Sequence, residues 1–288
     1  MDSPRKHARR WVKAHGTASV YRKVCDVGEM SCFVPDLAKR LALRQRPRGI
    51  PVMRQRWAGL GFFHWAVDPA VINERLPKGL HVDTFEGRAW LGVVPFRMER
   101  IRPVGVPPLP WLSWFLELNV RTYVHDEHGN AGVWFFSLDC NQPLAVEVAR
   151  RTFRLPYEHA VMSTTEQNGI IDYRCRRKRQ DEAATFHYPA ASRAKECAPD
   201  SLEWFLVERY LLFSCNAAGE LFTGRVHHRP YQVETMPEAI WSATPLRWDG
   251  FPEMNSPPES MLSAATVDVT VFPLRRLRHH ADPLDAVG

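Results

Sequence analysis

The 288-residue chain has the composition of a globular protein, with 45% hydrophobic and 24% charged residues, and its length suits one large domain or two modest ones. No apolar run reaches the roughly 20 residues of a membrane-spanning helix, and no N-terminal apolar segment has the features of a secretory signal. We therefore expect a cytoplasmic protein without a membrane partner. The formal net charge of +6 would indicate a nucleic-acid partner only if it belonged to the folded body.

The basic charge is concentrated at the N-terminus. Residues 1–49 hold twelve Lys or Arg and four Asp or Glu, whereas the remainder holds 26 basic and 28 acidic side chains. We expect residues 1–48 to form a basic, flexible extension that ends in the linker-like RPRGIP and contains one short helix at PDLAKRLALRQR. A single domain is expected over residues 49–275, followed by a C-terminal tail over 276–288. A solvated arm is the simpler interpretation, so nucleic acid is an unlikely partner.

The chain lacks the common cofactor and metal motifs. Its six cysteines are scattered singly, and no C-x-x-C pair occurs, which indicates free thiols in a reducing compartment. No G-x-G-x-x-G, P-loop, G-x-S-x-G or H-E-x-x-H motif is present. We therefore expect no metal and no nucleotide cofactor.

From Met53 the chain consists of short apolar segments separated by Pro and Gly, which is typical of a mainly β domain. Strands are predicted at WAGLGFFHWAV and RAWLGVVPFRMERIRPV, with a short helix between them that begins after Asp68 with Pro69 at its first position. FLELNVRTYV and AGVWFFSLDC are predicted to form a hairpin through HDEHGN. Asn141 is then expected to cap a helix over QPLAVEVARRTF.

The C-terminal half continues the mainly β pattern. GIIDYRCRRKR and EAATFHYP are predicted to form a hairpin around QD. DSLEWFLVERYLLFS is predicted to be a helix with a capping box made by Asp200 and Glu203. GELFTGRVHHRPY and AATVDVTVFPL are predicted to be late strands.

The segment FLELNVRTYV, residues 115–124, carries the clearest chemical signal. Side chains of a strand alternate between its two faces, so one face here is apolar or β-branched: Leu116, Leu118, Val120, Thr122 and Val124. The other face is largely polar: Phe115, Glu117, Asn119, Arg121 and Tyr123. This polar face is either a solvated surface or the lining of a cavity. Glu117 and Arg121 are roughly 13 Å apart along the strand and cannot pair directly, so each would need another partner inside a cavity.

Three segments resemble the uncharacterised bacterial YqjF-like family: GFFHWAVDPAVINERLPKGLHVDTFEGRAWLGVVPF, FLELNVRTYVHDEHGNAGVWFFSLD and ARRTFRLPYEHAVM. With FLVERYLLFS and VHHRPYQVE, the likeness covers roughly residues 53–275. That family is grouped with the acetoacetate-decarboxylase-like fold. The resemblance implies a mainly β (α+β) protein, an antiparallel β-barrel or cone with a central cavity and a few flanking helices. It favours the cavity interpretation of the polar face, with helices over the apolar face.

The resemblance also bears on the chemistry. In acetoacetate decarboxylases a strand glutamate lines the cavity, and Glu117 matches that position. ARRTFRLPYEHA resembles the segment that carries the Schiff-base lysine, but Tyr157 stands at the lysine position and Glu158 at that of the neighbouring lysine. A phenol cannot form the iminium that this decarboxylation requires. We therefore do not expect a Schiff-base decarboxylase.

These observations define a set of candidate site residues. The candidate catalytic residues are Glu117, as acid, base or orienting group, and Tyr157, as hydrogen-bond donor. The candidate ligand-binding residues are Arg121, as an anion clamp, Asn119, Tyr123, Arg150 and His64. A structural role is the alternative for each of them, above all for His64, which lies among aromatic residues.

Two functions remain open. One is an enzyme, or a degenerate relative of one, that acts on a small carboxylate or carbonyl compound in the barrel. The other is a non-catalytic module that binds a small organic molecule. A homo-oligomer is compatible with either function.

Overall fold

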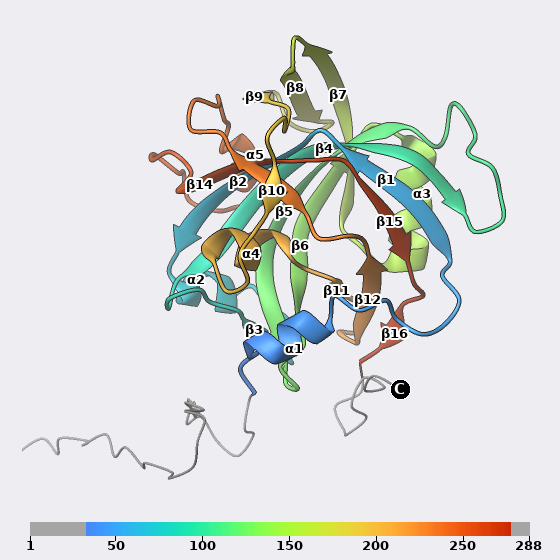
Figure 1. Ribbon diagram of the computed structural model, residues 1–288, viewed down its shortest axis with the longest axis vertical. Helices are drawn as coiled ribbons and strands as arrows, with labels where there is room; N and C mark the ends of the chain where they lie inside the picture. Colours follow the sequence, from blue (N-terminus) through green and yellow to red (C-terminus); the bar gives the residue numbers. More distant parts are fainter. Residues whose placement is uncertain (1–32, 278–288) are drawn as a thin grey trace, which may run out of the picture. The chain divides into compact units, whose positions relative to one another are not determined.

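A computed structural model describes residues 33–277 (Figure 1), and the predictions for residues 1–32 and 278–288 lie outside the described residues. The first elements are α1 (Leu37–Ala42), β1 (Met53–Ala58), β2 (Leu60–Val67), α2 (Pro69–Asn73), β3 (Leu80–Val82), β4 (Ala89–Pro103), β5 (Phe115–Asp126), β6 (Ala131–Cys140) and α3 (Pro143–Phe153). They are followed by β7 (Tyr157–Gln167), β8 (Ile170–Arg177), β9 (Ala184–Pro189), β10 (Lys195–Glu196), α4 (Leu202–Val207), β11 (Leu211–Cys215), β12 (Leu221–His227), β13 (Gln232–Thr235), α5 (Thr244–Trp248), β14 (Ser260–Ala264), β15 (Val267–Val271) and β16 (Arg275–Arg276). No helix among the described residues is long and apolar enough to cross a membrane.

Seven of the described strands pair in a closed ring. The pairs run from β4 to β1, β15, β12, β11, β6 and β5, and from β5 back to β4. Strand β4 closes the ring because its 15 residues are long enough to pair with β5 along the first part and with β1 at the end. The predicted mainly β architecture is therefore confirmed. The sheet is mixed rather than purely antiparallel, because β6 runs parallel to both β11 and β7.

The two faces of β5 contact different cores, as the alternation of the sequence predicts. Tyr123 belongs to an apolar cluster with Phe205 of α4. Leu118 and Val120 belong to a second cluster, together with Phe186 of β9 and residues of α2, β8 and α5. The apolar face therefore packs mainly against residues of β8 and β9. Short helices contribute to this cover but do not form all of it, contrary to expectation.

Helix α1 packs on the folded body. Asp36 caps the helix by accepting a hydrogen bond from its backbone, and both terminal nitrogens of Arg40 donate to Asp83 at 2.6 Å. Leu43 packs against the apolar cluster that contains Leu80. The compact unit that contains α1 begins at Phe33.

Two predicted helix caps differ from the observed ones. Gln142 caps α3, whereas the Asn141 side chain accepts a hydrogen bond from the backbone of β5. Ser201 caps α4, whereas Asp200 has a positive φ of 68° and lies before the helix. The helix also ends at Val207 instead of continuing to the end of the apolar run, because the chain turns there to enter β11.

Candidate functional site

A cavity of about 330 Å³ lies inside the ring. Strands β1, β4, β5 and β6 line it on one part of the ring, and helix α3 contributes apolar residues such as Ala145, Ala149 and Phe153. Most of its wall is aliphatic or aromatic. Its hydrogen-bonding side chains are Gln55, Trp57, Arg102, Glu117, Arg121, Tyr157, Arg209 and Tyr231. Glu117 and Arg121 both line the cavity, as their shared strand face predicts.

Glu117 and Tyr157 form a buried hydrogen-bonded pair at this cavity. Tyr157 Oη donates to Glu117 Oε2 at 2.7 Å, and both residues are buried. The local fold fixes the phenol in place: Arg154 ends α3 in the left-handed conformation with φ 53°, and the chain then enters β7 at Tyr157. Because β7 runs parallel to β6, which itself pairs with β5, Tyr157 lies near Glu117 despite the 40 residues between them.

Burial dominates the electrostatics of this pair. It raises the pKa of Glu117 from 4.5 to about 7, and Asp139 adds to the rise, while hydrogen bonds from Tyr157 and Asn119 oppose it. The Glu117 carboxyl therefore changes its protonation near neutral pH. Burial, together with the nearby Glu117, raises the pKa of Tyr157 well above its ordinary value. The phenol therefore remains protonated and can act as a donor.

Besides Arg102, two further guanidinium groups line the cavity, those of Arg121 and Arg209. Arg121 Nη2 donates to the backbone oxygen of Leu206 at 3.1 Å and to Tyr123 Oη at 3.3 Å. Arg209 follows α4 and donates from Nη1 to Asp83 Oδ2 at 2.7 Å. Arg121 Nε and Arg209 Nη2 are buried and have no hydrogen-bond partner among the described residues. An unpaired buried donor is unfavourable. These two nitrogens could therefore donate hydrogen bonds to an acceptor on a ligand.

The buried charges around these arginines do not balance. Asp83 is the only carboxylate that pairs with Arg209 among the described residues, and it also pairs with Arg40. Arg121 forms no ion pair with a carboxylate of residues 33–277. Burial lowers the pKa of Arg209 to about 10, which leaves the guanidinium protonated at neutral pH. Arg40 and Arg209 thus share the carboxylate of Asp83, and Arg121 has no carboxylate partner among the described residues.

Three further polar residues support Arg121 and Glu117: Tyr123 and Asn119 of β5, and His64 of β2. Tyr123 Oη lies 2.7 Å from His64 Nε2 and accepts the hydrogen bond from Arg121. Burial lowers the pKa of His64 well below 6.5, so the imidazole is neutral and its Nε2 can accept a hydrogen bond from the phenol. Asn119 hydrogen-bonds Glu117. None of these three residues lines the cavity, and their contacts position Arg121 and Glu117.

Arg150 lies outside the cavity lining, contrary to the expectation that it contacts a ligand. Its Nε donates to the backbone oxygen of Tyr157 at 2.7 Å, and its terminal nitrogens lie 3.5 Å from Glu158 and 3.6 Å from Glu147. Helix α3 turns Ala145 and Ala149 toward the cavity and leaves Arg150 on another face. Arg150 therefore contacts the start of β7 and is not among the residues that line the ring cavity.

Sequence reasoning missed Arg209 and Tyr231 among the cavity residues. Arg209 interrupts a long apolar run, which was predicted to form one continuous helix. The interruption itself, the charged pair Glu208-Arg209 between LEWFLV and YLLF, was the available signal.

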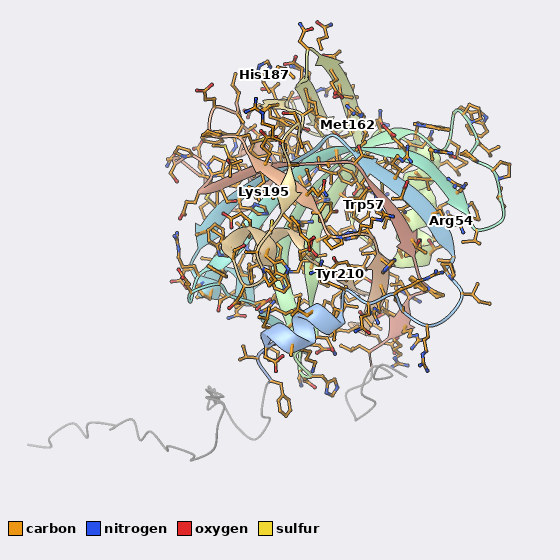
Figure 2. The ribbon with its side chains drawn as sticks, viewed as in Figure 1. Arg54, Trp57, Met162, His187, Lys195 and Tyr210 are labelled. Carbon is orange, nitrogen blue, oxygen red and sulfur yellow. The ribbon has the colours of Figure 1, made fainter. Side chains whose placement is uncertain are left out.

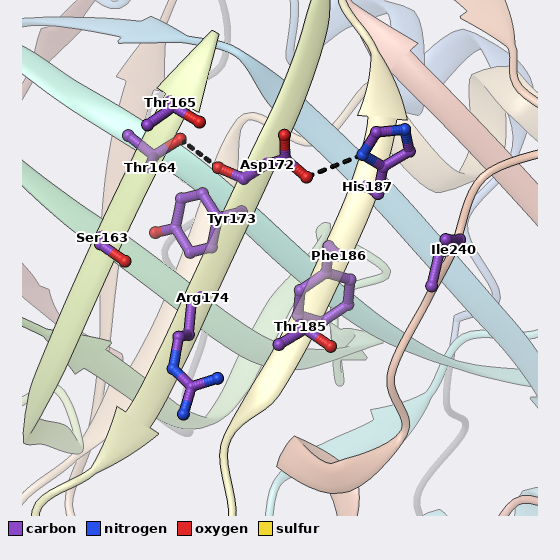
Figure 3. Close-up of a pocket in the computed structure, with 10 residues that line it drawn as sticks. All are labelled: Ser163, Thr164, Thr165, Asp172, Tyr173, Arg174, Thr185, Phe186, His187 and Ile240. Atoms are coloured by element: carbon purple, nitrogen blue, oxygen red, sulfur yellow. Dashed lines mark hydrogen bonds and ion pairs between the residues drawn. The ribbon is translucent and has the colours of Figure 1, made fainter.

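A second hollow, of about 360 Å³, lies on the β7–β9 layer (Figure 3). It contains an Asp172–His187 contact of 2.7 Å between two exposed side chains. Figure 2 shows His187 away from Trp57, which lines the ring cavity. The two hollows share no lining residue. Because the second hollow holds no buried charge, we assign the candidate site to the ring cavity.

The described lining of the ring cavity has few groups that could bind a metal or act as a nucleophile. No group of three or more His, Cys, Asp or Glu side chains within residues 33–277 could hold a metal ion. The lining residues that the structure describes include no lysine, cysteine or serine. Tyr157, at the position that the family resemblance assigns to the Schiff-base lysine, has only its phenol to offer.

Comparison with solved structures identifies the fold. Acetoacetate decarboxylase from Legionella pneumophila subsp. pneumophila str. Philadelphia 1 superposes with a TM-score of 0.55 at 15% identity, covering 81% of this chain and 92% of that one. The enduracididine biosynthesis enzyme MppR, complexed with pyruvate, gives a TM-score of 0.54 at 12% identity and covers 82% of this chain and 95% of its own. At these identities the likeness shows the fold alone, which is acetoacetate-decarboxylase-like.

Comparison of sequences identifies the family. The chain is 37% identical over 232 residues to the uncharacterized protein YqjF of Bacillus subtilis (strain 168), covering 80% of this chain and 94% of that protein. Residues 54–268 match the family DUF2071, described as an uncharacterized conserved protein. The chain therefore belongs to the DUF2071 family, with YqjF as a bacterial relative.

Proposed function

We propose that the protein binds a small organic carboxylate in the ring cavity, with the ligand's carboxylate at Arg209 and Arg121. The observation that carries this proposal is the Arg209 guanidinium, which lines the cavity, is buried and has no partner for Nη2. A carboxylate would accept charge-assisted hydrogen bonds from both guanidinium groups. It would also supply the negative charge that Asp83, already shared with Arg40, provides only in part.

A protein of similar fold is known in complex with a small carboxylate. MppR is described as a complex with pyruvate, which is a carboxylate with an adjacent carbonyl group. Its identity of 12% to this chain carries no residue role across. It supports the proposal only in that the same fold accommodates such a molecule.

We further propose that Glu117 transfers a proton to or from the bound molecule. A carboxyl that titrates near neutral pH is suited to act as a general acid or base, and burial raises the pKa of Glu117 to about 7. Tyr157 holds the carboxylate in place through its 2.7 Å hydrogen bond. Since the described lining offers no amine or thiol nucleophile, proton abstraction next to a carbonyl group is the reaction class that these residues can perform.

A non-catalytic binding module is the alternative, and one observation favours it. Tyr157 already donates a hydrogen bond to Glu117, so one carboxylate oxygen of Glu117 has a partner within the protein. In this alternative, Glu117 and Tyr157 only shape the cavity and orient the ligand.

Binding is tested by titrating the protein with pyruvate and butyrate, and with their neutral amides, by calorimetry. We expect the acids to bind more tightly than the amides, and Arg209→Gln to weaken acid binding at least about tenfold, as the loss of a charge-assisted hydrogen bond implies. Arg151→Gln is the matched control, because its side chain is 82% exposed. Equal binding of acids and amides would refute the carboxylate site.

Proton transfer is tested separately, by following exchange of the methyl protons of pyruvate for deuterons in deuterated buffer by NMR. We expect the protein to accelerate this exchange and Glu117→Gln to remove the acceleration while pyruvate still binds. Binding without accelerated exchange in the wild type would refute the acid–base role for this substrate and favour the binding module.

A further inference from the structure

We propose that the acid bound in the cavity is a monocarboxylic acid with an apolar body of roughly six to ten carbons, a length set by the cavity volume. This inference rests on the proposed function, because it takes the carboxylate site at Arg209 and Arg121 as given. It names the class of molecule that fits the remainder of the cavity.

The cavity is strongly asymmetric in chemistry. Its charged hydrogen-bond donors come from Arg121 of β5 and from Arg209 after α4. Most of the remaining lining is aliphatic or aromatic, from strands of the ring and from one face of α3: Met53, Met98, Ile101, Leu112, Phe115, Val133, Phe135, Leu138, Leu144, Ala145, Val148, Ala149, Phe153 and Leu155. Such a wall gains free energy by contact with apolar atoms and offers almost nothing to a polar ligand.

The volume indicates the size of the occupant. A cavity of about 330 Å³ has room for about eleven water molecules at roughly 30 Å³ each. An acid of two to four carbons would leave more than half of this space to water against apolar walls. Octanoate, with ten non-hydrogen atoms, would bring apolar atoms against most of the wall while its carboxylate reaches the arginines.

The same wall continues to the surface along α3. Leu144 and Val148 line the cavity, yet they are 48% and 46% exposed. The cavity therefore reaches solvent beside this helix through apolar side chains. Gln142 Nε2 donates to the backbone oxygen of Trp111 at 2.9 Å, which ties the loop between β4 and β5 to the start of α3 at this opening. An alkyl chain pointing outward from the arginines would cover Leu144 and Val148.

The test is a titration with straight-chain acids from acetate to decanoate, measured by calorimetry well below their micelle-forming concentrations. We expect affinity to rise about fourfold per methylene, the equivalent of ~0.8 kcal/mol for each buried CH₂ group, and to level off once the chain leaves the cavity. Ala149→Trp should fill the apolar part and weaken octanoate at least about tenfold with little effect on propionate. Val148→Asp, at a half-exposed position, should also weaken octanoate binding selectively. It replaces Ala149→Trp in the test if the tryptophan disturbs folding.

The possible outcomes distinguish the medium-chain ligand from the carboxylate site on which this inference rests. If no acid of any length binds, or if octanol binds as tightly as octanoate, the carboxylate site itself is refuted. If acetate and octanoate bind with the same affinity and both respond to Arg209→Gln, the carboxylate site stands and the medium-chain ligand is refuted. Selective loss of octanoate binding in both α3 variants supports the inference.

Discussion

Replacing Glu117 by Gln should change the pH dependence of protein stability in a defined direction. The pKa of this carboxyl is about 7 in the folded protein and 4.5 without burial. Between these values the folded state binds more protons than the unfolded state. The contribution of Glu117 to stability is therefore fully present below about pH 4.5 and is lost as the pH rises through 7.

The size of this effect follows from the same two values. A rise of the pKa from 4.5 to about 7 corresponds to about 3 kcal/mol between the two protonation states. Glutamine keeps an oxygen that can accept the Tyr157 hydrogen bond and never ionises. We therefore expect Glu117→Gln to leave stability almost unchanged at pH 4.5 and to raise it relative to the wild type by up to about 3 kcal/mol at pH 8.

Urea unfolding of both proteins at several pH values between 4.5 and 8 measures the difference. Burial raises the pKa of Asp139 to about 6, so Asp139 also makes stability fall with rising pH. It does so in both proteins, and its contribution largely cancels in their difference. Glu158→Gln, which removes a carboxylate at a partly exposed position outside the cavity, is the matched control. Parallel stability curves for the wild type and Glu117→Gln would refute the claim that Glu117 is buried with a raised pKa.

Three further predictions concern the fold and the absent lysine chemistry. Arg40→Ala should lower the free energy of unfolding by about 3 kcal/mol, because it removes one partner of the buried Asp83 carboxylate; unchanged stability in urea unfolding would show that α1 contributes little. Borohydride treatment with pyruvate should leave no covalent adduct in the mass spectrum, because Tyr157 has no amine, and a lysine adduct would contradict the site. Val120→Glu should abolish soluble expression by placing a charge in the fully buried cluster against β8 and β9, whereas the exposed Val161 should accept the same change.

The alternation of β5 allowed two residues of the candidate site to be placed from sequence. Glu117 and Arg121 share a strand face by the period of two, and the structure brings both to the ring cavity. A local pattern was sufficient here, because the side of a strand follows from its own residues once one face is apolar. The same reasoning separates Leu118 and Val120 into the opposite core.

Long-range features of the site were less accessible. Arg209 pairs with Asp83 across 126 residues, and the interruption of the apolar run at Glu208-Arg209 does not by itself identify this distant partner. The parallel pairing of β6 with β11 and β7 likewise depends on contacts distant in sequence. Arg150 was assigned to the cavity by its nearness to Tyr157 in the chain, but the rotation of α3 turns it away.

A crystal structure with 8-bromooctanoate tests the central claim most directly, because the anomalous signal of bromine locates one end of the ligand. We predict a carboxylate oxygen within hydrogen-bond distance of Arg209 Nη2, about 3 Å, and bromine near Val148 of α3. A ligand found only on the outer surface, or one whose carboxylate points to Val148 and whose bromine lies at Arg209, would contradict the account.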